Sequence, residues 1–337
     1  MRIATYNVEW MSNLFDDNGT LLSDSEWSGR RDVTRAAQLD ALGVVFTALD
    51  ADAVMIIEAP DSHRRRDGVD ALETFADWAG LRARRAVMGF VNDTQQEISL
   101  LYDPDCLTPR HDPQGYDTDT EAPRFDGVFR IDLDIDDTLD AVRWSKPPLE
   151  LSVETQGGAT FRMIGVHAKS KAPYGVEGRE AIMQLAIANR RKQLAQCIWL
   201  RRRVDAHLAA GDPLIVLGDL NDGPGLDDYE KLFRRSGVEI VLGEPGEARM
   251  YDPHAETLLQ RRFGERPTSA RFYIADKGRY LQTLLDYVMV SPDLKDRQGD
   301  WRIWHPFDDP GCYGDAALRE ALLTASDHFP VSLDIDL

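Results

Sequence analysis

Polar side chains of the kinds that bind metal ions and phosphate stand beside two apolar runs in this sequence. The segment LIVLGDLND occupies residues 214–222, and SDHFPVSLDI occupies residues 326–335. Runs of Val, Ile and Leu bounded by Gly or Pro are typical of buried β-strands. Carboxylates and a histidine at the tips of such strands suit binding of a hard cation and a phosphate oxygen. The two segments therefore predict a site for phosphate chemistry.

Four further strand-like runs end in the same way. Asn7 follows RIATY, Glu58 follows AVMII, His167 follows RMIGV and Asp286 follows LQTLL. Polar residues stand at six strand ends, spread over 337 residues. Solvent exposure alone does not readily explain this pattern. Active-site residues often lie where strands of a rigid scaffold run into loops. We expect these residues to share one site.

The series TYNVEW, IIEAP, GVHAKS, GDLND, LDYVMV and SDH resembles the endonuclease/exonuclease/phosphatase superfamily, including its deoxyribonuclease-like members. Each motif is weak alone, but their shared order is a strong signal. The resemblance runs from residue 3 to about residue 335, which predicts a single domain over residues 1–337. One departure is Ile57, because the family often has Gln before its metal-binding Glu.

The resemblance implies a metal site. It makes Glu58 the principal ligand of a catalytic Mg²⁺ or Mn²⁺, places Asn7 beside the metal, and makes Asp327 a second carboxylate on the metal side. A carboxylate after a buried apolar run is costly unless it is paired or metal-bound, which agrees with the role of Glu58. Glu9 is expected to face solvent or another residue of the sheet.

The catalytic residues follow from the same resemblance. Asp219 and Asn221 lie two apart, so an extended chain points both to one side, although GDLNDGPG is also turn-like. Asp219 is expected to activate water and Asn221 to fix the phosphate. His328, oriented by Asp286, is expected to donate to the phosphate or to the attacking water, and His167 to protonate the leaving oxygen. Whether Asp219 or His328 is the base stays open.

Several cations are candidates for contacting phosphate. Lys146 stands before Pro where relatives frequently have Arg, and Lys169 and Lys171 follow His167 at alternate positions. Arg64 and Arg65 lie in the basic loop RRRD. Their positive charge would neutralise phosphate, but solvated lysines and a solvated loop explain the same pattern.

The formal net charge of −19 argues against general binding of a polyanion. The charge is uneven, however. Residues 112–140 hold ten acidic and two basic residues, whereas residues 179–203 hold seven basic and one acidic. A positive rim on an acidic body would accept nucleic acid, and an acidic rim would favour a small phosphoester.

Apolar periodicity predicts helices and strands that alternate along the chain. Helices are expected at 31–50, 69–79, 179–208, 223–232 and 315–324. Strands are expected at 2–8, 53–57, 84–91, 97–103, 129–135, 147–155, 161–169, 214–219, 281–290 and within 326–335. Segments 12–30, 105–127, 243–280 and 308–314 are expected to be loops, turns or irregular. The predicted fold is α/β (α+β): a four-layered sandwich of two packed, mainly antiparallel sheets with helices on the outer faces.

Composition narrows the class of protein further. The apolar fraction of 43% is ample for a core, and no apolar run reaches the ~18 residues of a membrane span. Three separated cysteines without a C-x-x-C motif suit a reducing compartment. No signal peptide is visible, so a cytoplasmic location is expected.

We therefore expect a divalent-metal-dependent phosphoester hydrolase, acting as an endonuclease or exonuclease on DNA or RNA. The alternative is a phosphatase or phosphodiesterase of a small metabolite or lipid head group. A more remote alternative is a non-catalytic interaction protein on the same fold.

Overall fold

Two main β-sheets form the centre of the computed structural model, which describes all residues except 117, 133–137, 173–174, 225–234, 247, 261–265 and 298. The first sheet contains, in spatial order, β14 (Asp300–Ile303), β15 (Val331–Asp334), β1 (Arg2–Asn7), β2 (Ala53–Ala59), β4 (Glu97–Tyr102) and β3 (Arg85–Met88). The second contains β13 (Asp286–Val290), β10 (Leu214–Asp219), β9 (Thr160–His167), β8 (Leu149–Thr155) and β5 (Leu107–His111). Pairs β1–β2 and β9–β10 are parallel, and the other neighbours are antiparallel.

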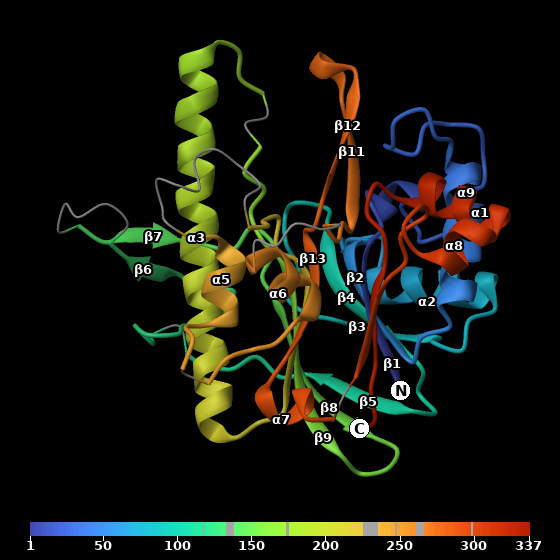
Figure 1. Cartoon of the computed structure of the whole chain (residues 1–337). Coiled ribbons are helices and arrows are strands. Elements are labelled where there is room, and N and C mark those ends of the chain that lie inside the picture. Colours follow the sequence, from blue (N-terminus) through green and yellow to red (C-terminus); the bar gives the residue numbers. More distant parts are fainter. Residues whose placement is uncertain are drawn as a thin grey trace.

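Helices cover the outer face of each sheet (Figure 1). The first sheet packs against α1 (Arg35–Leu49), α2 (Gly68–Ala79) and α9 (Ala316–Ala325). The second packs against α3 (Arg179–Ala210) and α5 (Gly237–Leu242). A third apolar cluster lies between the sheets. This arrangement of helices, sheet, sheet and helices confirms the predicted fold class.

Side-chain alternation explains how one strand serves two of these apolar layers. In β1, Ile3 faces the second sheet, whereas Ala4 and Tyr6 face the helices. Successive residues of a strand point to opposite faces, so a strand covered on both sides is apolar throughout. The run AVMII in β2 has this character, and all five residues are buried.

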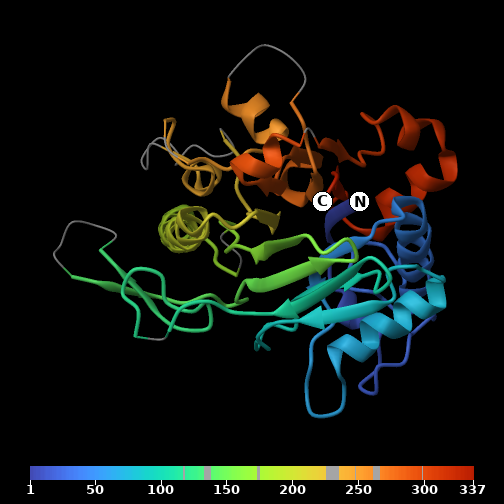
Figure 2. The ribbon, with the colours of Figure 1, turned by 90° about the horizontal axis from the view of Figure 1, so that it is seen from below.

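Smaller elements complete the chain. They are η1 (Met11–Leu14), α6 (Pro253–Leu259), η2 (Ala275–Lys277), α7 (Pro292–Lys295), α8 (Pro310–Gly314), and two hairpins, β6 (Phe129–Ile131) with β7 (Asp140–Val142) and β11 (Ala270–Ile274) with β12 (Arg279–Thr283). The β11–β12 hairpin projects beyond the sheets in Figure 1, and the β6–β7 hairpin extends outward in Figure 2.

Parts of the predicted loop assignment are wrong. Segment 105–127 contains β5, segment 308–314 contains α8, and segment 243–280 contains α6, β11 and the start of β12. The predicted strand 281–290 is two strands, which belong to different sheets. The hairpin strands are short and largely exposed, so they lack the apolar run that marks a buried strand. For α6, the start signal was present, since Asp252 caps the helix and Pro253 begins it.

Some expectations lie outside the described residues. Most of the predicted helix 223–232 and the second half of the predicted strand 129–135 fall there.

The two ends of the chain meet in the first sheet. β1 pairs with β15 in antiparallel register, and the amino group of Met1 donates to the carbonyl oxygen of Ile335 at 2.9 Å. Residues near both ends can therefore approach one site. Of the helices in the described part of the chain, none has the length and apolar character needed to cross a membrane.

Candidate active site

Three of the predicted catalytic residues form a row across the second sheet. His167, Asp219 and Asp286 end or begin the adjacent strands β9, β10 and β13. Asp219 pairs directly with His167 on one side and with Asp286 on the other. Residues that pair directly across neighbouring strands lie side by side on one face of a sheet. Strand register therefore brings together three residues that are far apart in the sequence.

This row faces the first sheet. In β10, Ile215 and Leu217 point into the apolar layer between the sheets. Asp219 lies two residues after Leu217, so its side chain points to the same face. The apolar layer thus ends in polar groups at this edge of the sandwich. Gly218 makes the close approach to β9 possible, because a Cβ there would lie 2.1 Å from the carbonyl oxygen of Val166. Its φ of +134° is also one that favours glycine.

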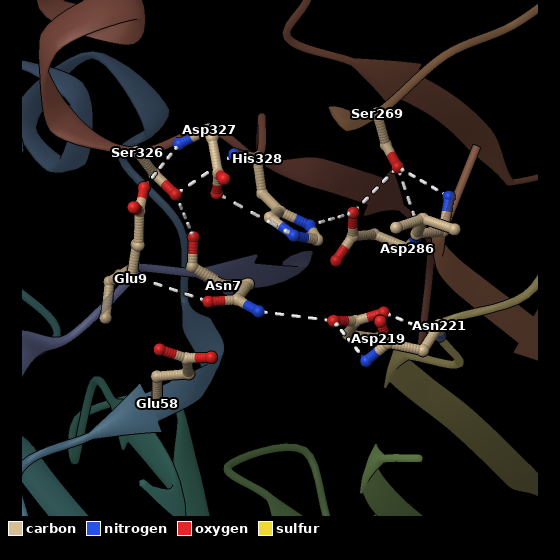
Figure 3. Close-up of polar contacts among 12 residues, drawn as sticks. Asn7, Glu9, Glu58, Asp219, Asn221, Ser269, Asp286, Ser326, Asp327 and His328 are labelled. Atoms are coloured by element: carbon tan, nitrogen blue, oxygen red, sulfur yellow. Dashed lines mark hydrogen bonds and ion pairs between the residues drawn. The ribbon is translucent and has the colours of Figure 1, made fainter. Parts of the chain in front are cut away.

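The first sheet contributes Asn7 from the end of β1. Its side-chain amide donates to Asp219 Oδ2 at 3.2 Å, and its Oδ1 accepts from the backbone N–H of Glu9 at 3.1 Å. Asn7 is almost fully buried. The contact between Asn7 and Asp219 joins the two sheets at the site, as Figure 3 shows.

A β-bulge aims Glu58 at the same region. Ile57 pairs with Ile98 and Ala59 pairs with Glu97, so Glu58 is the unpaired extra residue. Its φ is +64°, which is uncommon for a residue other than glycine. Bulges re-aim side chains and are enriched beside active sites. The carboxylate accepts from the backbone N–H of Trp10 at 3.0 Å and lies near Asn7 in Figure 3.

His328 is held in place by a chain of hydrogen bonds. Its Nδ1 lies 2.7 Å from Asp286 Oδ2, and the same carboxylate oxygen accepts from Ser269 Oγ at 2.7 Å. Ser269 Oγ also accepts from the backbone N–H of Asp286 at 3.0 Å. The ring of Phe272 packs edge-on against the imidazole with 5.5 Å between centroids. The predicted orientation of His328 by Asp286 is therefore present in the structure.

Asn221 is bonded mainly to Asp219. Its backbone N–H donates to Asp219 Oδ1 at 2.7 Å, and its side-chain amide donates to Asp219 Oδ2 at 3.1 Å. The amide also donates to the carbonyl oxygen of Ala168 at 3.1 Å. Both amide hydrogens are thus engaged, so Asn221 orients Asp219 in this arrangement, and its contact with phosphate stays a prediction.

Glu9 supports Asp327. The Glu9 carboxylate accepts from the backbone N–H of Asp327 at 3.0 Å and forms an ion pair with Arg30. Asp327 Oδ1 lies 3.9 Å from His328 Nε2. The expectation that Glu9 faces solvent or another sheet residue missed this contact. Glu9 lies two residues after Asn7, and in an extended chain this spacing points both side chains to the same side. The sequence therefore did contain a signal that Glu9 lies at the site.

Two carboxyl groups of the site hold their protons unusually tightly. Burial raises the pKa of Asp219 to about 7, with repulsion from Asp286 adding to the effect and His328 opposing it. Burial also raises the pKa of Asp327 to about 8, and repulsion from Glu9 adds to it. The pKa of Glu58 is raised by burial too. In each case burial outweighs the nearby positive charge, which comes from His328, from Arg30 beside Asp327 and from Lys146 beside Glu58.

The two histidines have opposite charge preferences. Burial opposes the charged form of His328, but attraction by Asp286, Asp219 and Asp327 outweighs it and raises its pKa well above the ordinary value. Burial, together with repulsion from Lys146 and His328, lowers the pKa of His167 well below it. Near neutral pH the site therefore holds a cationic His328 and a neutral His167.

Lys146 stands beside the neutral histidine. Its Nζ lies 3.2 Å from His167 Nε2. An ammonium group has no acceptor, so it donates to Nε2, and the neutral ring then carries its hydrogen on Nδ1. Burial lowers the pKa of Lys146, while Glu58 and Asp219 act against this shift. Lys146 is the nearest of the predicted phosphate-binding cations to the catalytic row.

The site has the donor chemistry of a divalent-cation site. One ligand atom each from Asp219, Asp286 and His328 lies within 4.8 Å of the others, and all three residues are buried. Asp286 Oδ1 is buried without a hydrogen-bond partner. A buried carboxylate oxygen without a donor fits a hard cation. The residues present therefore fit Mg²⁺ or Mn²⁺, while the ligand set Asn7, Glu58 and Asp327 stays a prediction.

The remaining predicted cations divide into two groups. Lys169 is partly exposed beyond β9, whereas Lys171 is bonded to the buried carboxylate of Asp222 at 2.5 Å. Arg64 and Arg65 line a separate hollow of about 440 Å³ that contains none of the predicted catalytic residues. Arg65 forms an ion pair with Asp17. A phosphate contact by Arg64 or Arg65 stays a prediction that requires a long substrate.

Asp222 anchors the loop after β10. Its fully buried carboxylate accepts from Lys171, from Arg190 at 2.9 Å and from the backbone N–H of Gly237 at 2.5 Å. Gln193 of α3 donates to the carbonyl oxygen of Asn221 at 2.8 Å. Sequence reasoning gave Asp222 no role. Nothing in GDLND marks which of its carboxylates is anchored by α3.

Comparison with known proteins agrees with this geometry. The sequence matches the Endonuclease/Exonuclease/phosphatase family over residues 4–328. No curated protein sequence matches the chain. Similar solved structures include an AP endonuclease from Archaeoglobus fulgidus (12% identity, TM-score 0.51) and a 3′ phosphatase from Neisseria bound to a product DNA hairpin (14%, 0.51). A mannosyl-6-phosphatase from Bacteroides thetaiotaomicron is also similar (14%, 0.50). Each comparison covers 100% of both chains.

The buried row of acid and imidazole groups lies where the edges of the two sheets meet. Because the family match spans nearly the whole chain, the protein belongs to the Endonuclease/Exonuclease/phosphatase family. The solved structures, at 12–14% identity, support the fold alone.

Proposed function

We propose that this protein is a divalent-metal-dependent phosphodiester hydrolase that acts on nucleic acid. The observation that carries the proposal is the buried row of His167, Asp219 and Asp286, completed by His328 and faced by Asn7 and Glu58. A divalent cation held by Glu58, with Asn7 and Asp327 beside it, would supply charge stabilisation for the developing phosphoryl oxygens.

The residues of the chain have distinct tasks in this mechanism. Asp219, fixed by Asn7 and Asn221, accepts a proton from the attacking water, for which a pKa of about 7 is suitable. The cationic His328, held by Asp286, stabilises negative charge on the phosphoryl group. Both groups are in place before substrate arrives, so little reorganisation is required.

We assign assistance of the leaving oxygen to the residues on the side of the site where His167 lies. The neutral imidazole accepts from the Lys146 ammonium at Nε2, so it positions the positive charge of the lysine rather than donating a proton itself. Lys146, 3.2 Å from His167, supplies positive charge beside it. Protonation of the leaving oxygen by His167 stays a prediction, and we propose that Lys146 takes part in this step.

A phosphatase or phosphodiesterase of a small phosphoester is the second candidate. The net charge of −19 favours it, because an acidic body repels a polyanion. A non-catalytic interaction protein is disfavoured, because such a protein has no use for the cost of clustered, desolvated carboxylates.

A substrate panel with metal and chelator tests the proposal. The purified protein is offered plasmid, single-stranded DNA, RNA, a small phosphodiester and phosphomonoesters with Mg²⁺ or Mn²⁺. We expect diester cleavage that stops with chelator and returns when metal is added back. Asp219→Asn and His328→Ala should each lower kcat/KM by at least ~10²-fold. Turnover that is insensitive to chelator, or cleavage of phosphomonoesters alone, would contradict the proposal.

A further inference from the structure

Three lysines lie on the side of the site that α3 covers. Lys146 contacts His167 at the end of β9, and Lys169 follows that histidine by two residues. The backbone N–H of Lys169 donates to Gln196 Oε1 of α3 at 2.9 Å. Lys192 lies four residues before Gln196, so both occupy the same face of the helix. The lysines therefore extend from His167 toward α3.

This stretch of α3 is fixed against the loops of the site. Asn189 donates to the carbonyl oxygen of Ala172 at 3.1 Å, and Gln193 donates to the carbonyl oxygen of Asn221 at 2.8 Å. Lys192 lies between these two residues in the sequence, and its side chain is only partly exposed. Its position relative to the catalytic row is thus set by hydrogen bonds on both sides.

Neither Lys169 nor Lys192 is neutralised by a carboxylate in the part of the chain that the structure describes. Across the residues that the structure describes, Lys169 and Lys192 form no ion pair with a carboxylate, whereas neighbouring Lys171 and Arg190 both contact Asp222. The pKa of Lys192 is lowered by burial and then by the charge of Lys169. Repulsion between partly buried cations is unfavourable, and a bound anion relieves it.

We propose that Lys169 and Lys192 bind a backbone phosphate next to the scissile one, on the His167 side, in a nucleic-acid strand. The proposal rests on the proposed function and deepens it by naming two residues that bind the nucleic-acid strand beside the scissile phosphate. A small monoester or diester has one phosphate, which Lys146 and His328 already address. Two further cations that lie close enough to repel each other fit a substrate that has another phosphate along the chain.

The contact is sequence-independent. Lysine binds phosphate as a point charge and reads no base. Such contacts release counterions, so they make affinity depend on salt. The local cations thus allow an acidic protein to bind a polyanion in one restricted region.

The first test is equilibrium binding of a fluorescent single-stranded oligonucleotide to the Glu58→Gln protein, which is expected to bind without cleaving. Adding Lys169→Ala and Lys192→Ala should weaken binding about 10-fold, and the slope of log affinity against log salt should become less steep by about 1.4. The matched control is Lys295→Ala, an exposed lysine on α7 whose ammonium lies over the Tyr251 ring at 4.3 Å. It should leave both quantities unchanged.

The second test compares two substrates in the active protein. The double lysine variant should lower the ratio of kcat/KM for the oligonucleotide to that for a small phosphodiester about 10-fold. An unchanged ratio, or an unchanged salt slope, overturns the proposal. If the wild-type protein hydrolyses only small phosphoesters, the lysine proposal fails while phosphoester hydrolysis stands. If nothing is hydrolysed with metal present, the proposed function fails, and the binding result still decides the lysine proposal.

Discussion

Two clusters of metal-ligand side chains lie near opposite ends of β2 and have different chemistry. The basal cluster is Asp52, Asp103 and Cys106, and Asp52 immediately precedes the strand. The active-site cluster is Asp219, Asp286 and His328, near the end of the strand where Glu58 stands. In each cluster the three ligand atoms lie within 4.8 Å of one another. Proximity alone therefore does not distinguish them.

Arginines neutralise the basal cluster. Arg82 forms ion pairs with Asp52 and with Asp103, and Arg84 lies 3.4 Å from Asp103. Burial acts to raise the pKa of Asp52, but the hydrogen bonds from Arg82 and from the backbone N–H of Arg2 outweigh it and lower the pKa. This cluster is a structural ion-pair network that joins β2, β4 and the segment before β3.

The active-site cluster has a histidine in place of these arginines, because His328 lies 2.7 Å from Asp286. Within the described residues, no arginine or lysine forms an ion pair with Glu58, Asp219, Asp286 or Asp327. The pKa of Asp219 rises to about 7 and that of Asp327 to about 8, chiefly through burial. Carboxylates that have no arginine or lysine partner remain able to bind a cation or accept a proton. The difference in compensation, rather than in geometry, separates a functional cluster from a structural one.

The largest expected effect is on catalysis at the active-site end of β2. Glu58→Gln keeps the size of the side chain and removes its charge, so kcat/KM for a phosphodiester should fall by at least ~10²-fold. The melting temperature of the metal-free protein should not fall, because a desolvated carboxylate is removed. Wild-type activity in this variant would show that Glu58 has no part in the site.

At the basal end of β2 we expect a substitution to lower stability and to leave catalysis unchanged. Asp52→Asn leaves Arg82 without one of its carboxylate partners, so the free energy of unfolding should fall by about 1–3 kcal/mol. The kcat/KM should stay within about twofold of wild type. Denaturant unfolding and steady-state kinetics measure both quantities. A loss of activity without a loss of stability would remove the distinction between the clusters.

The two clusters should also have opposite pH dependence in the metal-free protein. Asp52 has a lowered folded-state pKa, so its stabilisation is present above its unfolded pKa near ~3.9 and is lost as pH falls through the folded value. Asp327 has a raised folded-state pKa of about 8, so the protein is destabilised as pH rises from its unfolded pKa through that value. Asp327→Asn should therefore stabilise the protein at about pH 9 and have little effect near pH 4.

The matched comparison is Asp52→Asn under the same conditions. It should destabilise at neutral pH, and the effect should diminish at acid pH. Unfolding curves for both variants across this range, in chelator, provide the measurement. If Asp327→Asn instead destabilises the protein, and does so most at high pH, the charged carboxylate of Asp327 is stabilised by its surroundings. The predicted contrast with Asp52 would then be wrong.

The sequence was sufficient to predict β1, β2, β9 and β10, which carry four of the predicted site residues. Their apolar runs are buried on both faces, and the polar residue at each tip interrupts the run, as in LIVLGD. The same signal identified Asn7 and Asp219, whereas Asp286 begins β13 instead of following a buried run. The roles of Asp286 and His328 came from the resemblance to the family, and their 2.7 Å contact agrees with it.

Other features depend on long-range packing. The bulge at Glu58 is set by pairing of β2 with β4, and nothing in AVMIIEA shows the extra residue. Ser269 contacts Asp286 from a hairpin whose exposed strands have weak sequence signals. The basal ion pairs join residues that are 19, 21 and 30 positions apart, so the sequence alone could not distinguish Asp52 from the carboxylates of the site.

Isothermal titration calorimetry tests most directly which of the two clusters binds a metal ion. Mn²⁺ is titrated into the wild-type protein and into the Glu58→Gln and Asp52→Asn variants. The account predicts Mn²⁺ binding in the wild-type protein, weakening of at least ~10-fold in Glu58→Gln, and wild-type affinity in Asp52→Asn. Equal affinity in the wild-type and Glu58→Gln proteins, or loss of binding in Asp52→Asn alone, would contradict the claim that the carboxylates without an arginine or lysine partner form the metal site.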